Sequence, residues 1–120
     1  MDKLESIFTD IKSMIDKQTG EEGIEFVHGK FSGIGWLKFH YVCSTYNGEY
    51  PRLLLKRQKD AVHLYALLWD DGKPVLERYI CVFGKSAVGK SCVRIKTLDD
   101  KRVRALHEII DMAIVKHNFM

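Results

Sequence analysis

The most conspicuous chemical feature of the sequence is a match to the Walker A pattern G-x-x-x-x-G-K-[ST], which runs from Gly84 to Ser91. In nucleotide triphosphatases such a loop leads from a strand into a helix, whose N-terminal N–H groups and dipole hold phosphate. Here residues 92–96 alternate in polarity and contain β-branched Val93 and Ile95, which is typical of a strand. We therefore predict that the loop runs from a helix into a strand, which is the wrong direction for a P-loop.

Three interpretations of this segment follow. It is a glycine-hinged turn without a ligand, or it binds a small anion through Lys85, Lys90 and the loop amides without hydrolysing it. The third interpretation is an enzyme that acts on a phosphorylated small molecule through Lys85, Lys90 and Ser91. The expected chain direction favours the first two, and we predict a protein without catalytic activity of its own.

The cysteines and histidines give no metal or disulfide signature. Cys43, Cys81 and Cys92 are odd in number and widely spaced, so we expect reduced thiols and no resident cofactor. A nucleophilic site would need a cysteine or serine beside a histidine with an orienting group, and no local pattern supplies one. Cys92 follows a basic loop that could lower the pKa of its thiol. A small buried or half-buried thiol is the favoured interpretation.

Hydrophobic periodicity predicts the elements that must position these residues. An amphipathic helix extends from Leu4 to Thr19 and is closed by Gly20. Residues 20–35 are rich in glycine and predict a loop with a short strand at 24–27. Three antiparallel strands follow at 37–43, 52–58 and 61–69, with turns at Asn47–Gly48 and Lys59–Asp60.

The second half of the chain predicts two more helices around one more strand. Asp71–Gly72 ends the strand pattern, and Pro74 opens a short helix over 75–83 that Gly84 stops. A strand at 92–96 precedes a last helix, which Asp99 or Asp100 caps. This order favours an α+β fold: an antiparallel sheet of four or five strands with helices packed on one face. The length suits a single domain over residues 1–120.

The composition of the chain limits where the protein is expected to be located and which partners it is expected to have. Nineteen basic and sixteen acidic residues give a net charge of +3, which permits an anionic partner but disfavours a dedicated nucleic-acid-binding domain. The charged N-terminal segment predicts no secretory signal, and the apolar runs are too short to span a membrane. We expect a cytoplasmic protein, monomeric or homodimeric, whose partner is a protein or a small anionic ligand.

One face of the predicted sheet is basic. The residues expected to point inward are Leu37, Phe39, Tyr41, Val62, Leu64, Val93 and Ile95. The alternating residues expected to point outward are Lys38, His40, Lys56, His63, Tyr65, Arg94 and Lys96. This face is either an ordinary solvated surface or a contact surface for an anionic partner. The candidate binding residues are therefore Lys85, Lys90, Ser91, Arg94, Lys96, His63 and Tyr65.

Several segments resemble one protein family in the same order. They are His63-Leu64-Tyr65, Leu76-Glu77-Arg78-Tyr79, the run from Gly84 to Lys96, and Leu98-Asp99-Asp100. Together they resemble the YdhG-like family, a domain-of-unknown-function family of small bacterial proteins, over residues 36–115. The Gly-Lys-Ser-Cys segment that leads into a strand is the most specific part. The resemblance implies a helix-flanked antiparallel sheet related to the frataxin fold.

The resemblance also implies an alternative function. Some members are regarded as frataxin-like iron chaperones, which would deliver iron to iron–sulfur or haem assembly. Iron prefers clustered carboxylates, and the densest acidic group is Glu21, Glu22 and Glu25. The basic overall balance departs from the acidic ridge of such chaperones. A non-enzymatic binding domain is therefore the first hypothesis, and an iron chaperone is the alternative.

Overall fold

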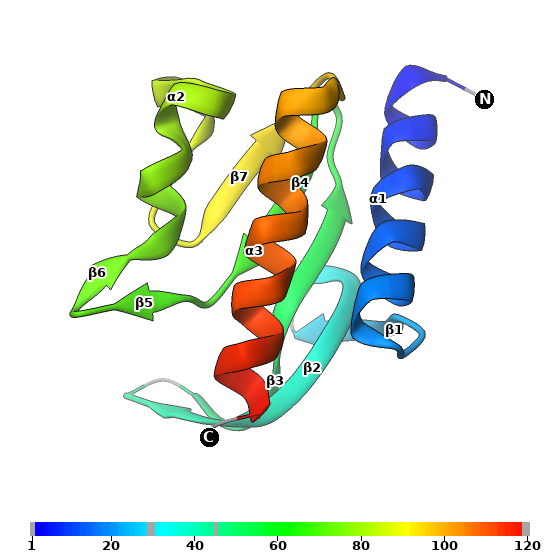
Figure 1. Ribbon diagram of the computed structural model, residues 1–120. Helices are drawn as coiled ribbons and strands as arrows, with labels where there is room; N and C mark the ends of the chain where they lie inside the picture. The colour runs from blue at the N-terminus through cyan, green and yellow to red at the C-terminus, as the bar shows by residue number, and fades with distance from the viewer. Residues whose placement is uncertain (1, 29–30, 45, 119–120) are drawn as a thin grey trace.

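The computed structural model of the chain describes residues 2–28, 31–44 and 46–118, which form one antiparallel sheet flanked by helices (Figure 1). The helical elements are α1 (Lys3–Thr19), η1 (Val75–Tyr79), α2 (Ile80–Phe83), η2 (Lys85–Ala87) and α3 (Asp100–Asn118). The strands are β1 (Ile24–His28), β2 (Phe31–Cys43), β3 (Tyr46–Arg57), β4 (Val62–Ala66), β5 (Trp69–Asp70), β6 (Lys73–Pro74) and β7 (Cys92–Ile95). The sheet has the order β1-β2-β3-β4-β7, and β5 and β6 form a separate hairpin. The predicted α+β fold is confirmed.

The first helix forms where the apolar periodicity predicted it. Asp2 precedes α1, and its carboxylate accepts a hydrogen bond from the Glu5 backbone N–H at 2.8 Å. Gly20 ends the helix at a φ of 75°, and its N–H donates to the carbonyl of Asp16. This left-handed C-cap is favourable for glycine because it has no Cβ. Within the described residues, no helix is both long and apolar enough to cross a membrane.

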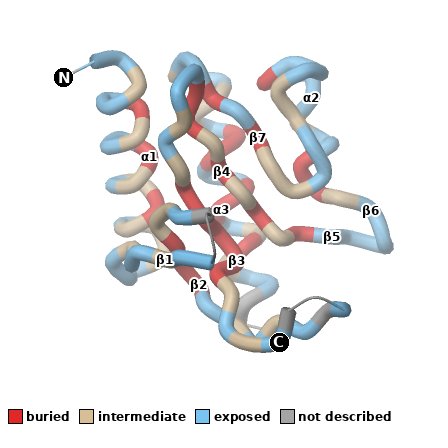
Figure 2. Tube along the Cα trace, turned by 180° about the vertical axis from the view of Figure 1, so that it is seen from behind, coloured by how far each residue is buried: buried red, intermediate tan, exposed pale blue. Residues whose placement is uncertain are grey.

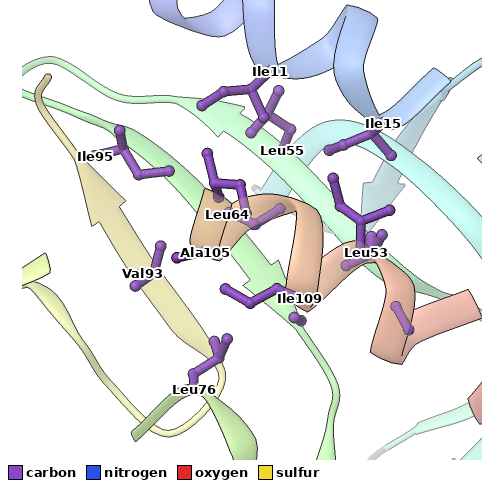
Figure 3. Close-up of a cluster of buried hydrophobic side chains, with 14 of the residues drawn as sticks. Ile11, Ile15, Leu53, Leu55, Leu64, Leu76, Val93, Ile95, Ala105 and Ile109 are labelled. Atoms are coloured by element: carbon purple, nitrogen blue, oxygen red, sulfur yellow. The ribbon is translucent and has the colours of Figure 1, made fainter. Parts of the chain in front are cut away.

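The core lies between the sheet and the two long helices, which cover the same side (Figure 1). Ile11 and Ile15 of α1 and Ile109 of α3 meet the inward side chains of the strands (Figure 3). The inward strand residues shown there are Leu53, Leu55, Leu64, Val93 and Ile95. All of these side chains are fully buried, so the hydrophobic stripe of each helix is matched by alternate residues of the sheet.

A half-buried polar contact joins the end of α1 to the sheet. Asp16 Oδ1 accepts hydrogen bonds from the Gly23 N–H and from Trp36 Nε1, both at 2.8 Å. Its other oxygen accepts from Lys12 Nζ at 2.9 Å. Burial by itself would raise the pKa of this carboxyl, but the three hydrogen bonds outweigh burial and lower the pKa below its usual value. Asp16 therefore stabilises the fold in its ionised form.

Replacing Asp16 by asparagine is expected to lower the free energy of unfolding by about 1 kcal/mol at pH 7, since Asn keeps an acceptor but loses the charge. A lowered folded-state pKa contributes stability above pH ~4 that disappears as the pH falls through that pKa. The gap between wild type and D16N should therefore close on acidification. Urea unfolding at pH 7 and pH 3 measures it, and an equal gap at both values would contradict this role.

Two features of the central hairpin differ from the prediction. β2 begins at Phe31, inside the segment predicted as a loop. Asn47 and Gly48 are not a turn but lie within β3, paired with Val42 and Tyr41. The chain reverses instead between Cys43 and Tyr46, which are themselves paired. The buried pairing of residues 34–36 with 53–55 sets the register, and the reversal must follow it.

The later elements confirm the predicted order with shifted boundaries. The strand expected at 61–69 ends at Ala66, and Trp69 belongs to the separate β5–β6 hairpin, whose turn is Asp71–Gly72. The helix expected over 75–83 begins as a 3-10 helix and becomes α-helical only at Ile80. Asp99 caps α3 as predicted, accepting from the Arg102 N–H at 2.9 Å.

Candidate functional site

The Walker-like segment lies where a helix gives way to a strand. α2 ends at Phe83, the chain turns at Gly84, and the single 3-10 turn η2 follows. Gly89 donates its N–H to the carbonyl of Cys92 at 2.8 Å, and Val88 forms a bridge with Val93. The segment is thus folded back onto the start of β7. The predicted chain direction is confirmed: Lys90 leads into a strand, and the amides after it belong to the sheet.

Beside this loop lies a hollow of about 310 Å³ lined by cations, hydroxyls and the apolar side chains of Phe83 and Ala87. Arg94, Lys96 and Arg102 contribute the charges, and Ser86 and Thr97 contribute the hydroxyls. Arg94 Nη2 donates to the Ser86 carbonyl, which attaches β7 to the loop. Arg102 Nη1 pairs with Asp99 Oδ2 at 2.7 Å, so the helix cap also orients this guanidinium. Such a lining suits an anion.

The lining differs in part from the predicted set. Arg94 and Lys96 are brought together as expected, whereas Lys85, Lys90 and Ser91 are not among the residues that line the hollow. Arg102 was missed by the sequence reasoning. The sequence feature that could have identified Arg102 is its position three residues after the capping Asp99. This position puts it in the first turn of α3, beside the end of β7.

A second hollow, of about 330 Å³, lies along the same surface. Arg94 and Lys96 line it together with His63 and the turn residues Lys59 and Asp60. Arg94 and Lys96 therefore border both hollows. Arg94 of β7, Lys96 just after that strand and His63 of β4 therefore form one continuous patch.

The cross-strand register explains this patch. Lys56, His63 and Arg94 are direct neighbours on β3, β4 and β7. Burial lowers the pKa of His63 below its usual value, and the positive charges of Arg94 and Lys56 lower it further. His63 is therefore neutral at pH 7, and the positive charge of the row comes from Lys56 and Arg94. This confirms the predicted grouping of these side chains.

The register also brings a cysteine to a histidine, which no local pattern indicated. Cys92 Sγ lies 3.8 Å from His63 Nδ1, and the Tyr65 hydroxyl lies 3.5 Å from the same nitrogen. Burial raises the pKa of the Cys92 thiol, against smaller opposing effects of Tyr65 and Arg94. The expectation that the basic loop lowers this pKa is wrong, because desolvation outweighs nearby charge. Cys92 is a half-buried, protonated thiol.

The other two cysteines lie apart from this group. Cys81 is exposed on α2. The side chain of Cys43 lies outside what the structure describes.

The prediction of the inward face is wrong for part of β2. Trp36, rather than Phe39 or Tyr41, is the fully buried core residue of this strand. Phe39 pairs with Tyr50, and the alternation places both on the side of Leu54. The strand phase follows the buried register of residues 34–36. Leu37 belongs to the core as predicted, but the apolar alternation beyond it, at Phe39 and Tyr41, does not mark fully buried residues.

The same shift moves two predicted outward residues. Lys38 and His40 are exposed, but they alternate with Phe39 and Tyr41 and so lie on the other side of the hairpin from Lys56 and His63. Leu37 is buried as predicted, in a left-handed backbone conformation with a φ of 58°. Its N–H donates to Glu21 Oε1 at 2.7 Å instead of joining the ladder.

We call the side of the sheet opposite α1 and α3 the open face (Figure 2). Strand alternation and pairing assign to it Phe26, Phe39, Tyr41, Tyr50, Arg52, Leu54, Lys56, His63, Tyr65, Cys92 and Arg94. The five strands contain only two carboxylates, Glu25 and Glu49. Glu25 pairs with core-packed Ile34, and Glu49 pairs with His40, so both alternate away from the open face. Within the described strands this face therefore carries cations and aromatic rings but no carboxylate.

The predicted iron ligands are not gathered into a cluster. Glu21 is held by its hydrogen bond from the Leu37 N–H, while Glu22 and Glu25 are exposed. Among residues 2–28, 31–44 and 46–118, no three His, Cys, Asp or Glu side chains come together as a metal site.

Comparison with known proteins adds no identification. No family model matches the chain, and neither the curated proteins nor the solved structures gave a significant match. The resemblance to the YdhG-like family therefore stays a prediction.

Proposed function

We propose that this chain is a small non-enzymatic binding domain that takes an anionic partner on its open face, next to the Gly84–Ser91 loop. The observation that carries the proposal is that the five strands place cations but no carboxylate on this face, the nearby Asp60 lying in the turn that borders the second hollow. Sixteen acidic residues almost balance the nineteen basic ones over the whole chain, yet the sheet strands place only cations on this side. This separation of charges by face produces a positive potential on the open face, although the net charge of the whole chain is only +3.

The hollow beside the loop supplies the proposed anchoring point. Arg94 and Arg102 present planar guanidinium groups, which bind phosphate, sulfate or carboxylate oxygens in bidentate fashion. Their bonds to Ser86 and Asp99 reduce the freedom that binding would otherwise remove. Lys96 adds a third charge and borders the second hollow, so an extended anion can continue toward His63.

Exchanging Arg94 and Lys96 for glutamine together is expected to weaken binding to a heparin oligosaccharide about tenfold, because two charges at the anchoring point are lost. The matched control is the double variant Lys3→Gln and Lys17→Gln, which makes the same charge change on exposed positions of α1. Calorimetry at two salt concentrations measures both. Equal weakening in the two double variants would show that binding follows net charge alone and would remove the proposal.

The proposal agrees with the resemblance to a family of small uncharacterised domains, and it places the chain in the cytoplasm, where its thiols stay reduced. The iron-chaperone alternative would use Glu21, Glu22 and Glu25 instead. Those residues lie on and beside β1, whereas the proposed site is centred on β4 and β7. The two functions therefore predict sensitivity to different substitutions.

A further inference from the structure

Aromatic rings form a connected set on the open face, next to the basic residues. Phe26 of β1 meets Tyr50 of β3 edge to face, with ring centroids 5.2 Å apart. Tyr50 lies 5.6 Å from Tyr41, and Tyr41 lies 5.8 Å from Phe39, both on β2. All four side chains are only half-buried. The rings thus extend across three neighbouring strands while part of each stays in contact with solvent.

The aromatic set ends in a hollow that combines rings with cations. This hollow, of about 480 Å³, lies where Phe39, Tyr41, Arg52, Leu67 and Trp69 meet Lys116 near the end of α3, so it is at the edge of the open face rather than in its middle. The Arg52 guanidinium lies 4.3 Å from the centroid of the Phe39 ring and donates to the Leu67 carbonyl at 3.1 Å. Trp69 is 40% exposed at the start of the β5–β6 hairpin. The hollow offers stacking surfaces beside fixed positive charge.

The aromatic and basic parts are continuous. Leu54 and Tyr65 lie side by side between them, and Lys56, His63 and Arg94 follow one pleat further along. Neighbouring strands are about 4.8 Å apart, so the distance from β2 to β7 across the face is about 14 Å. A ligand that covers the face must therefore offer flat apolar groups and anionic groups in turn over at least that length.

We propose that the open face binds single-stranded nucleic acid, with bases stacked on the rings near Trp69, Tyr41 and Tyr50 and phosphates held by Lys56, Arg94 and Lys96. This inference rests on the proposed function and names its partner class. Stacking platforms interleaved with cations are how proteins bind single strands, since every base offers a flat face and every linkage a charge. An acidic protein would use the cations but would have little use for a row of half-exposed rings. The modest net charge does not oppose the inference, because the charges are segregated by face.

The test measures fluorescence anisotropy of labelled twelve-residue oligothymidine and oligouridine, with a duplex of the same length for comparison. We expect both single strands to bind more tightly than the duplex and to weaken as salt rises. Trp69→Ala and Tyr41→Leu should each weaken single-strand binding about tenfold, because each removes a stacking partner. Tyr79→Leu is the matched control, since Tyr79 lies in η1 and bonds to Glu108 of α3, away from the open face.

Heparin separates this inference from the proposed function, because it carries anions but no bases. Trp69→Ala should leave heparin binding unchanged, whereas Arg94→Gln with Lys96→Gln should weaken both ligands. Unchanged oligonucleotide affinity in Trp69→Ala, a duplex bound as tightly as the single strands, or binding of polyglutamate but not of oligonucleotides would overturn the nucleic-acid inference. The proposed function would survive those results as long as heparin binding depends on Arg94 and Lys96.

Discussion

Replacing Trp36 by alanine is expected to lower the free energy of unfolding by about 3–5 kcal/mol. The indole is 1% exposed and belongs to the core that α1 and α3 share with the sheet. Truncation removes its apolar contacts and leaves a cavity that the surrounding strands cannot fully close. It also removes the donor that Asp16 Oδ1 accepts at 2.8 Å, at the junction of α1 with β1 and β2. One substitution therefore affects both the packing and the polar contact.

Trp36→Phe separates the two contributions, because it keeps most of the ring but cannot donate. We expect it to cost about 1–2 kcal/mol, mainly from the lost hydrogen bond and a small void. Urea unfolding followed by far-ultraviolet circular dichroism suits all variants, since fluorescence would then report Trp69 alone. If the alanine variant lost less than the phenylalanine variant, the indole would not be the core element of β2.

The long-range contact between Asp16 and Trp36 illustrates what the sequence could and could not predict. The helix stripe of α1, its glycine cap, the alternation of β7 and the cap of α3 are local patterns, and the structure confirms them. Each is local because burial of one face repeats at the period of the element itself. The direction of the Gly84–Ser91 segment was predictable for the same reason.

The phase and register of the central hairpin were not predictable from local patterns. Leu37, Phe39 and Tyr41 alternate like core residues, and Leu37 is in the core. Phe39 and Tyr41 are only half-buried, whereas Trp36, within the pairing of residues 34–36 with 53–55, is a fully buried core residue. This pairing depends on contacts with helices that lie far away in sequence. The turn predicted at Asn47–Gly48 does not form, because a register that placed it there would shift the strand pairing and expose the buried side chains of β3.

The residues of the candidate site show the same difference between local patterns and long-range contacts. Arg94, Lys96, His63 and Tyr65 were found by alternation along β4 and β7, where the expected phase was right. The aromatic set was missed because the wrong phase in β2 placed Phe39 and Tyr41 inside. The proximity of Cys92 to His63 depends on the register between β4 and β7, which neither strand encodes alone.

Glycines in the segment predicted as a loop provide the second large effect, and Gly23→Ala is expected to cost about 2–3 kcal/mol. A Cβ at this position would lie 2.6 Å from two carbon atoms of the Trp36 indole and would also collide with the Ile34 side chain. Both neighbours are packed on the core, so neither can move without disturbing it. The glycine therefore marks a close approach between the end of α1 and β2, not the mobility of a loop.

Gly20→Ala is the informative control, because a Cβ there meets no atom within 4 Å and only the left-handed φ of 75° opposes it. That strain is expected to cost about 1 kcal/mol. The two variants thus change the same residue type within one short segment but test different physical causes. Thermal and urea unfolding of both should rank Gly23→Ala as the more destabilised. Combining Gly23→Ala with Trp36→Phe should recover part of the loss, because the smaller ring makes room for the methyl group. An additive double variant would show that the Trp36 ring is not what excludes a side chain at position 23.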